Sequence, residues 1–482
     1  MQVETAPANH PPTPTPATPG SPPPETERDP WPIVVLALAL AVIVLNAARS
    51  PFDSDTWWHL RSGELILDRG SLPSEDPFAW TAAGDPWRIN SWLFDVLAAA
   101  SRSVAGTGPL IALTLLAAAG FGVACYLLAR RAGARPWPSV AVATTFTVLL
   151  TRDVAERPQI ISYLLFAVAL VVAPRALAGS NRALAALAVL IALWANLHFA
   201  FIAGVLVVML LAGAAAIQEH RFRRAAVVGA TCIVAGLLTP FGLGAYRAAF
   251  QTRGTSDLIN EWQSVTLTQP RDVFLVVVVL LTGVSMWRTG RWRHLAYVLP
   301  VAVFGALTLD AIRNASFLFL VAAGELALGC SALPLRRVRE WPRLRRMALV
   351  HGLVLGLTIM VVVGLPALGN ARPTAGDTYP IRATAAIPDG CRVLNEYIWG
   401  GYITDMRWPD VLVSQDGRNG NEQGLARQRS ALLGEPGALE WIDRNDVDCV
   451  VAKRDRPLLA RLRAEGWRQT ATDPTGVLLV RP

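Results

Sequence analysis

Lysine and, more generally, charge are scarce in this sequence. Of its 482 residues, 17% are charged and 53% are hydrophobic, and Lys453 is the single lysine. Ordinary soluble domains carry roughly 25% charged residues, so the composition argues against a soluble globular protein. The apolar residues come in blocks of about 16 to 20, the length that crosses a hydrocarbon core of about 30 Å. The main body of the chain is therefore predicted to lie in a lipid bilayer.

Cysteine is also rare, and no Cys-x-x-Cys motif or His/Cys cluster indicates a zinc site. Three of the five cysteines, Cys125, Cys232 and Cys330, fall inside apolar blocks, where cysteine acts as a small buried hydrophobe. The other two, Cys391 and Cys449, lie near the C-terminus. They can form a disulfide if that segment is extracytoplasmic, and the alternative is two unpaired cysteines in strands.

The formal net charge of +8 does not indicate a nucleic-acid partner. Nucleic-acid binding requires basic residues gathered on one soluble face. Here the arginines lie in short clusters between apolar blocks. Their positions carry information about membrane topology instead.

Eleven apolar blocks predict an all-α polytopic membrane domain of about 11 transmembrane helices over residues 31–368. A Pro-rich tail at 1–30, which is expected to be disordered and cytoplasmic, precedes them. The first block, 31–48, is too long and too poorly led by positive charge for a cleaved signal peptide, so we interpret it as a retained anchor. The segment 92–105 can form an additional interfacial helix. The other blocks lie near 109–129, 137–151, 160–174, 183–197, 199–217, 225–241, 273–287, 295–309, 316–333 and 348–366.

Arginine clusters occur in alternate loops between these blocks. They lie at 130–135, 175–182, 221–224, 288–293 and 336–346, and the loops between them are poorer in arginine. By the positive-inside rule the arginine-rich loops are cytoplasmic. External loop one, at 49–91, and everything from 369 onward are then predicted to lie outside a plasma membrane.

The last part of the chain, 369–482, has the pattern of a small extracytoplasmic α/β domain. Strand-like runs at 392–397, 411–414, 447–452 and 476–480 are interspersed with helix-like runs at 437–444 and 457–465. Gly466 is expected to end the second helix. Gly400–Gly401 and Asp416–Gly417 predict tight turns.

External loop one contains the strongest candidates for chemistry, Asp53 and Asp55. Two carboxylates just outside a membrane span can act as a base, or hold Mg²⁺ or Mn²⁺ against phosphate oxygens. They can equally be ordinary solvated charges. Trp57 and Trp58 can lie against a sugar face, or simply anchor a helix end at the membrane surface.

Other polar residues fall in loops that are expected on the same side. Arg152 and Arg157 can bind a lipid phosphate through their guanidinium groups, or form an interfacial ion pair. His198 lies where an apolar hairpin turns, and it can bind a ligand, transfer a proton or pack by hydrogen bonding. Glu325, by contrast, lies inside the apolar block near 316–333 and is the main charged residue within any block. It can be a proton site, or it can form hydrogen bonds within the bundle.

Several motifs resemble those of bacterial membrane proteins related to the GT-C-fold glycosyltransferases. The first is the run from Asp53 to Glu64, DSDTWWHLRSGE, followed by LPSEDPF at 72–78, PW at 86–87 and SWL at 91–93. Further matching segments are Arg157–Gln159, Trp194–His198, Thr239–Gly242, Asn395–Tyr402 and Asp416–Arg418. The resemblance covers most of the chain after residue 50.

The resemblance implies an enzyme that uses polyprenyl-phosphate-linked sugars. Asp53 and Asp55 stand where the group has its acidic motif, so they are the expected catalytic residues. Substrate or lipid-phosphate binding is expected at Trp57, Trp58, His59, Arg152, Arg157 and His198. The expected partners are membrane lipid, a polyprenyl-phosphate sugar donor and an unknown acceptor, with Mg²⁺ or Mn²⁺ compatible but not required.

The C-terminal domain departs from the resemblance because it is smaller than the long periplasmic domain of many oligosaccharyl and arabinosyl relatives. The class of acceptor therefore stays open. A non-enzymatic transporter, or an assembly protein that binds lipid carriers on the same scaffold, is the alternative function.

Overall fold

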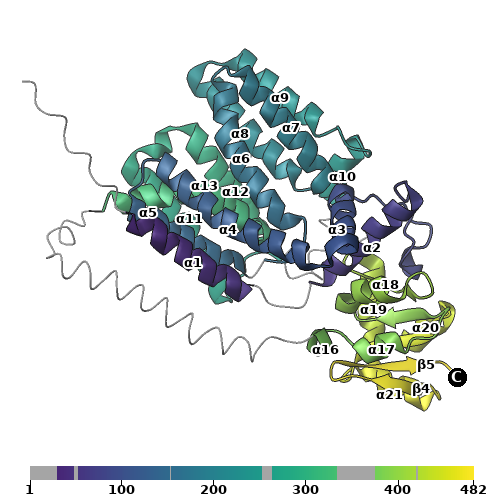
Figure 1. Cartoon of the computed structure of the whole chain (residues 1–482). Helices are drawn as coiled ribbons and strands as arrows, with labels where there is room; N and C mark the ends of the chain where they lie inside the picture. The colour runs from purple at the N-terminus through teal and green to yellow at the C-terminus, as the bar shows by residue number, and fades with distance from the viewer. Residues whose placement is uncertain (1–29, 48–52, 152–153, 252–262, 334–374, 419–421) are drawn as a thin grey trace, which may run out of the picture.

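The computed structural model describes residues 30–47, 53–151, 154–251, 263–333, 375–418 and 422–482. Most of the chain forms a helical bundle, and a small sheet domain meets one end of it beside α2 and α3 (Figure 1). The predicted disordered tail, Arg152, the arginine cluster at 336–346 and the last apolar block lie outside the described residues.

The bundle contains a helix at each of the other ten predicted apolar blocks. Five of the helices are long and apolar enough to cross a membrane, namely α4, α6, α8, α11 and α13 with the short turn before it, and four shorter ones are also apolar. The count of eleven spans therefore remains a prediction. The helices are α1 (Trp31–Ala47), α4 (Gly108–Arg131), α5 (Pro136–Leu150), α6 (Gln159–Leu177), α7 (Asn181–Leu197), α8 (Phe201–Glu219), α9 (Phe222–Ala235), α11 (Pro270–Thr289), α12 (Leu295–Asp310) and α13 (Ala315–Ser331).

Helix α13 lies at the centre of the bundle, in contact with α4, α5, α11 and α12. Its aromatic side chains pack against several neighbours: Phe319 stacks on Phe146 of α5 at 4.6 Å, and Phe317 lies 4.9 Å from Phe166 of α6. Aromatic pairs at these distances stabilise a core beyond simple area burial. The short helices α10 (Leu243–Gln251), η5 (Arg291–Arg293) and η6 (Ile312–Asn314) connect longer ones.

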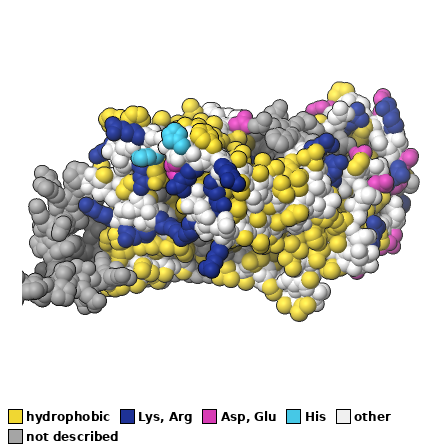
Figure 2. All heavy atoms as spheres, turned by 90° about the horizontal axis from the view of Figure 1, so that it is seen from above, with side chains coloured by type: hydrophobic (Ala, Val, Ile, Leu, Met, Phe, Trp, Pro, Cys, Tyr) yellow, Lys and Arg dark blue, Asp and Glu magenta, His cyan; other side chains and the backbone are white. Residues whose placement is uncertain are grey.

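Arginine-rich loops gather at one end of the bundle. Arg224 donates from Nε to the carbonyl of Ala176 at 2.7 Å, and Arg291 donates to the carbonyl of Ala132 at 2.8 Å. These bonds join loops that the sequence placed on one side of the membrane. Figure 2 shows basic side chains grouped toward one end of the apolar surface, with mixed acidic and basic side chains at the other.

External loop one is helical over much of its length, where the sequence had predicted only a polar stretch. It contains α2 (Ser54–Arg69) and η1 (Trp80–Ala82), and α3 (Trp92–Ala105) confirms the additional helix. Asp53 is the N-cap of α2 and accepts a hydrogen bond from the Asp55 N–H at 2.9 Å. Helices α2 and α3 approach closely at Gly63, where a Cβ would lie 1.9 Å from the Asp95 carbonyl oxygen.

The C-terminal domain is built on a five-stranded sheet in the order β2-β1-β3-β5-β4. Strand β1 is parallel to β2 and β3, whereas β5 is antiparallel to β3 and β4. The strands are β1 (Arg392–Asn395), β2 (Leu412–Val413), β3 (Cys449–Lys453), β4 (Arg468–Thr472) and β5 (Gly476–Val480). The helices are α16 (Ala375–Thr378), α17 (Ile381–Ala385), η7 (Tyr397–Trp399), α18 (Gly400–Arg407), α19 (Glu422–Leu432), α20 (Ala438–Arg444) and α21 (Pro457–Ala464).

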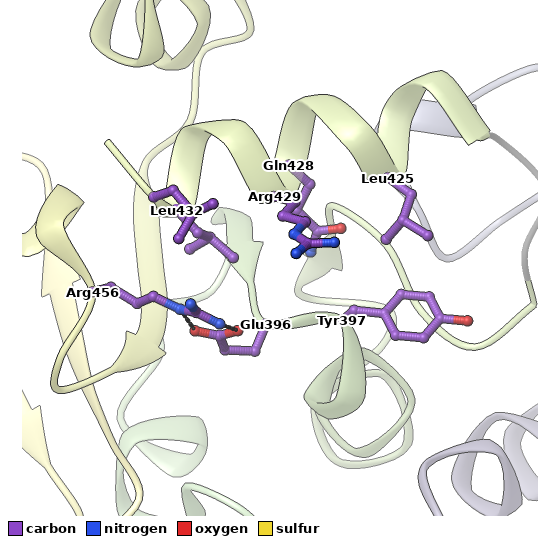
Figure 3. A pocket seen from close by; sticks show the side chains of 8 residues that line it. Glu396, Tyr397, Leu425, Gln428, Arg429, Leu432 and Arg456 are labelled. Carbon is purple, nitrogen blue, oxygen red and sulfur yellow. Dashed lines mark hydrogen bonds and ion pairs between the residues drawn. The ribbon is translucent and has the colours of Figure 1, made fainter. Parts of the chain in front are cut away.

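The four predicted strands and two predicted helices of this domain are confirmed, but α18, α19 and β4 were missed. Cys391 and Cys449 form the disulfide that the sequence allowed, between the start of β1 and β3. Glu396, just after β1, pairs with Arg456 beside a cleft under α19 (Figure 3). Gly466, with a φ of 86°, follows α21 as expected.

The prediction of a tight turn at Gly400–Gly401 is wrong, because both residues begin α18. Their small size serves close packing: a Cβ on Gly400 would lie 2.0 Å from the Gln415 carbonyl oxygen, and one on Gly401 would lie 2.4 Å from that of Ser54. The turn predicted at Asp416–Gly417 is present, and the Arg418 N–H donates to the Asp416 carboxylate at 3.1 Å.

Candidate active site

Asp53, Asp55 and Arg157 meet at the end of the bundle opposite the arginine-rich loops. Arg157, just before α6, donates from Nε to Asp53 Oδ1 at 2.5 Å, and its Nη1 lies 3.3 Å from Asp55 Oδ2. All three side chains stay partly exposed. The structure thus brings together three residues that the sequence had singled out from two separate loops.

Glu156 is a neighbour that sequence reasoning did not select as a site residue. Burial raises the pKa of its carboxyl, and the negative charge of Asp53 adds to that rise. Its backbone carbonyl accepts a hydrogen bond from Thr56 Oγ1 at 3.2 Å. Its position next to Arg157 in the sequence is the one signal that could have found it.

The C-terminal domain closes over Asp55 through the turn at Gly417. A Cβ on Gly417 would lie 1.7 Å from Asp55 Oδ1 and 3.0 Å from Trp58 Nε1. Gly401, at the start of α18, packs on the first turn of α2 beside Trp58. Gly417 therefore gives the candidate carboxylate its space, and Gly401 lets α18 approach the first turn of α2.

The two predicted tryptophans of α2 have different surroundings. Trp57 packs edge-to-face against Tyr379 at 5.7 Å and Tyr402 at 5.2 Å, so its ring holds α2 to the C-terminal domain. Trp58 lies on the ring of His59 at 3.6 Å, with its indole nitrogen buried near Asp55. Of the two, Trp58 is the one next to the candidate carboxylate.

His59 is buried and bound to Asp95 of α3. Its Nδ1 lies 2.6 Å from Asp95 Oδ1, and Phe94 packs edge-on at 5.4 Å. Burial raises the pKa of Asp95, while the attraction and hydrogen bond of His59 act in the opposite direction. The pair fixes α2 against α3 directly behind Trp58.

His198 belongs to a second buried polar group, at the turn between α7 and α8. Its Nδ1 lies 2.8 Å from Ser162 Oγ, which also accepts a hydrogen bond from Trp194 Nε1 at 2.8 Å. Burial lowers the pKa of His198 well below its usual range, and the positive charges of Arg313 and Arg157 lower it further. A neutral His198 near Arg157 can exchange a hydrogen bond but brings no charge to the site.

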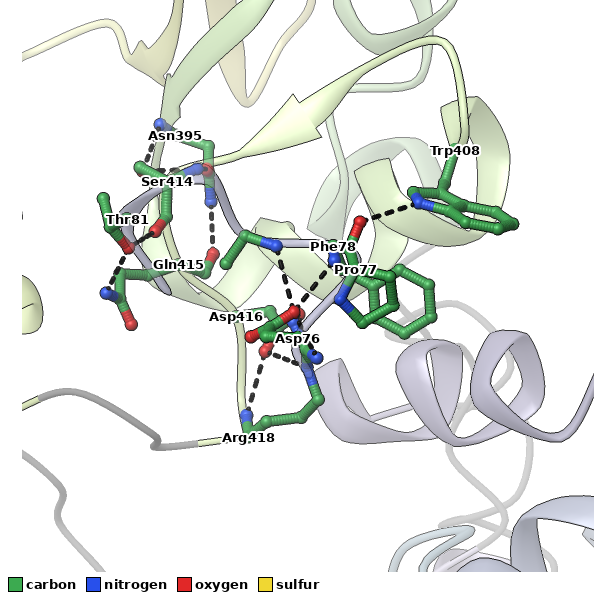
Figure 4. Close-up of polar contacts among 11 residues, drawn as sticks. Asp76, Pro77, Phe78, Thr81, Asn395, Trp408, Ser414, Gln415, Asp416 and Arg418 are labelled. Carbon is green, nitrogen blue, oxygen red and sulfur yellow. Dashed lines mark hydrogen bonds and ion pairs between the residues drawn. The ribbon is translucent and has the colours of Figure 1, made fainter. Parts of the chain in front are cut away.

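An ionic and aromatic cluster around Arg418 locks external loop one to the C-terminal domain (Figure 4). Arg418 is buried, pairs with Asp416 at 2.7 Å and with Asp76 at 2.8 Å, and lies over the rings of Phe78 and Trp87 at 4.7 Å. Local sequence patterns do not predict that this cluster forms, because Asp76, Phe78 and Trp87 lie more than 300 residues before Arg418.

Loop one also extends the edge of the C-terminal sheet. Ala79 pairs in parallel with Val413 of β2, and Trp80 Nε1 donates to the Val393 carbonyl at 3.1 Å. On the other side of α2, Arg102 of α3 holds both carboxylate oxygens of Asp405 at 2.8 Å. Loop one, α3 and the C-terminal domain therefore form one packed unit around Asp55.

Mg²⁺ or Mn²⁺ at Asp53 and Asp55 would have two carboxylates as protein ligands, with waters and substrate phosphate oxygens completing its coordination. In the described part of the chain, no group of three or more His, Cys, Asp or Glu side chains is arranged to hold a metal. Arg157 already supplies a positive charge to both carboxylates.

The fold matches solved structures of an archaeal oligosaccharyltransferase and of ArnT. The apo oligosaccharyltransferase of Archaeoglobus fulgidus aligns with a TM-score of 0.58 and 15% identity, over 88% of this chain and 70% of that one. ArnT from Cupriavidus metallidurans, solved bound to undecaprenyl phosphate, aligns with a TM-score of 0.53 and 12% identity, over 93% and 97% of the two chains. The archaeal enzyme AglB, solved with an inhibitory peptide and a dolichol-phosphate, aligns with a TM-score of 0.54 and 12% identity, over 88% and 69%.

No protein-family model matches the sequence, and a search of curated proteins finds no match. The likeness therefore lies in the fold, at sequence identities too low to carry a substrate. It spans both the helical bundle and the C-terminal domain, since it covers 88% of the chain or more. The chain accordingly shares its overall fold with these oligosaccharyltransferase and ArnT structures.

Proposed function

We propose that the protein is a membrane glycosyltransferase that moves a sugar from a polyprenyl-phosphate donor to an acceptor at the outer face of the membrane. The observation that carries the proposal is the cluster of Asp53, Asp55 and Arg157 on a GT-C fold, at the end of the bundle away from the arginine-rich loops. Solved structures of the same fold that hold dolichol-phosphate or undecaprenyl phosphate support a lipid-phosphate donor.

The cluster can supply both the general base and the phosphate-binding group that a sugar transfer needs. The acceptor oxygen attacks the anomeric carbon, the bond from that carbon to the phosphate oxygen breaks, and the electron pair leaves with the phosphate. Asp55 takes the acceptor's proton as a general base. Arg157 binds the departing phosphate, since a guanidinium pairs with phosphate through two parallel hydrogen bonds.

The ion pairs of Arg157 fit this division of roles. Arg157 holds Asp53 and Asp55 until a phosphate competes for the guanidinium. A phosphate that takes Arg157 then frees a carboxylate for the acceptor. Asp53, which also caps α2, keeps the helix end in place during the exchange.

Substitution of the two carboxylates tests the proposal. Purified full-length protein would be mixed with synthetic polyprenyl-phosphate sugars and membrane extract, and released polyprenyl phosphate would be measured by mass spectrometry. We expect Asp53→Asn/Asp55→Asn to lose at least about 100-fold in rate, as general acid–base catalysis typically contributes 10²–10⁴-fold. The matched control is Asp68→Asn, an exposed aspartate on the same helix.

The same assay separates the alternatives. Full activity in a folded double variant would remove the carboxylates as catalysts. Bound polyprenyl phosphate without sugar transfer by the wild type would instead indicate a lipid-carrier-binding assembly protein. Solute uptake into liposomes would indicate a transporter, although Glu325 lies 3.7 Å from Arg291 at the arginine-rich end of the bundle, where the pair offsets its charge.

A further inference from the structure

The C-terminal domain has a cleft of about 310 Å³ that the proposed reaction does not use. It lies between α19 and the chain that leaves β1, with Gln428 and Arg429 on one wall and Glu396 and Tyr397 on the other (Figure 3). At about 30 Å³ for each water in the liquid, the volume corresponds to roughly ten waters. This is room for a small organic ligand or for one or two residues of a peptide.

Two arginines line the cleft, and one of them, Arg429, is available to pair with a ligand. Arg456 donates from Nε and Nη2 to the two oxygens of Glu396 at 2.6 and 2.7 Å, and the Lys453 N–H adds a third bond at 3.2 Å. Glu396 is thereby fully engaged. Arg429 is exposed, and within the described part of the chain its guanidinium forms no ion pair.

Apart from Tyr397, the remaining lining consists of three leucines and one amide, Gln428. The three leucines that face the cleft are Leu425 and Leu432 of α19 and Leu433 just after it. Gln428 is 1% exposed, and its Nε2 donates to the Asn395 carbonyl. Its Oε1 is buried with no hydrogen-bond partner among the described residues. A buried acceptor without a donor is costly, so a rotation of this amide that turned Oε1 toward a ligand N–H in the cleft would relieve that cost.

We propose that this cleft binds a ligand carrying a carboxylate beside an aliphatic group and an amide N–H, the chemistry of a peptide end or acidic peptide segment, with Arg429 as the counter-ion. The guanidinium suits a planar carboxylate because two of its N–H groups match the two oxygens. The leucines receive the aliphatic group. The proposal goes beyond sugar transfer and does not depend on Asp53 or Asp55.

Two small probes that differ only in charge test the ligand chemistry. N-acetyl-leucine has the carboxylate, the isobutyl group and the N–H, whereas N-acetyl-leucinamide lacks the charge. Binding to full-length protein in detergent would be followed by ligand-observed saturation-transfer NMR. For a ligand of this size we expect N-acetyl-leucine to bind with a Kd on the order of 1–10 mM, and the amide to bind about tenfold more weakly.

Variants assign the binding to this cleft. Arg429→Gln is expected to weaken N-acetyl-leucine about tenfold, the loss of one charge-assisted pair. Arg427→Gln, an exposed arginine two residues away on α19 that does not line the cleft, is expected to bind as the wild type does. Leu433→Thr, at the apolar wall, is expected to weaken both probes.

Several outcomes would overturn the proposal. One is equal binding of the two probes, and another is an equal loss of affinity in the Arg427 and Arg429 variants. A third is no binding of N-acetyl-leucine at 50 mM, a concentration about 5 to 50 times the expected Kd. Because the measurement is binding and not turnover, its failure leaves the glycosyltransferase proposal untouched. Conversely, an inactive enzyme can still pass this test.

Discussion

At the scale of single residues, the candidate site consists of three charged groups and one glycine that leaves space for them. Arg157 pairs with both Asp53 and Asp55. Gly417 reaches Asp55 from the C-terminal domain, and its lack of a side chain lets the turn pack against the carboxylate. The sequence singled out the three charged residues but not Gly417, because a glycine before an arginine resembles any other turn.

Gly417→Ala is expected to reduce sugar transfer about 100-fold with little loss of folding. The φ of Gly417 lies outside the left-handed region, but an added Cβ would lie 1.7 Å from Asp55 Oδ1. The carboxylate or the turn must therefore move, and a displacement of about 1 Å at a reacting group can cost 10²-fold. Turnover of polyprenyl-phosphate sugar measures the effect.

The matched control is Gly283→Ala in α11, where an added Cβ meets no atom within 4 Å. It should leave turnover unchanged. If folded Gly417→Ala protein turned over as fast as the wild type, the turn of the C-terminal domain would have no part in placing Asp55.

At the scale of elements, hydrophobic periodicity and length located almost every helix of the bundle but missed α2, α18 and α19. These three are short or polar, and α18 begins at two glycines, which are typical helix breakers. Gly400 and Gly401 predict a turn by their backbone freedom, yet contacts with Gln415 and Ser54 decide that they enter a helix. Such tertiary contacts between distant segments are not encoded in local pattern.

The contact between α3 and α18 should make stability depend on pH through Asp405. Burial raises the pKa of Asp405 to about 6, and Arg102 opposes that rise. Because the folded-state pKa exceeds the unfolded value, the contribution to stability is full below about pH 4 and is lost as the pH rises through 6. Two pKa units correspond to about 3 kcal/mol.

Thermal unfolding in detergent between pH 4 and pH 7.5 measures this dependence. The wild-type Tm should fall more over that range than the Tm of Asp405→Asn, which cannot ionise. Asp389→Asn, at an exposed pair with Arg407 in the same domain, should keep the wild-type slope. Parallel pH curves for the wild type and the Asp405 variant would contradict the prediction.

At the scale of the whole molecule, the sequence predicted a membrane bundle and a small α/β domain but not how they join. The joint consists of pairs more than 300 residues apart, such as Arg102 with Asp405 and Arg418 with Asp76. No spacing rule connects such positions, since each partner looks like an ordinary surface charge in its own segment. The location of Asp55 beneath the C-terminal domain was unpredictable for the same reason.

Arg418→Gln is expected to loosen the C-terminal domain from external loop one. The substitution leaves the carboxylates of Asp416 and Asp76 without their shared guanidinium, and breaking a buried ion pair by removing one partner costs about 3–5 kcal/mol. Rapid proteolytic release of the C-terminal domain, followed by mass spectrometry of the fragments, measures this loss of stability.

The matched control is Arg481→Gln, which removes a pair with Asp443 whose side chains are 35% and 71% exposed. It should cost less than about 1 kcal/mol. Equal cleavage rates for the two variants would mean that the Arg418 cluster does not hold the domain, and that the remaining contacts, such as Trp57 against Tyr379 and Tyr402 and Arg102 with Asp405, are sufficient.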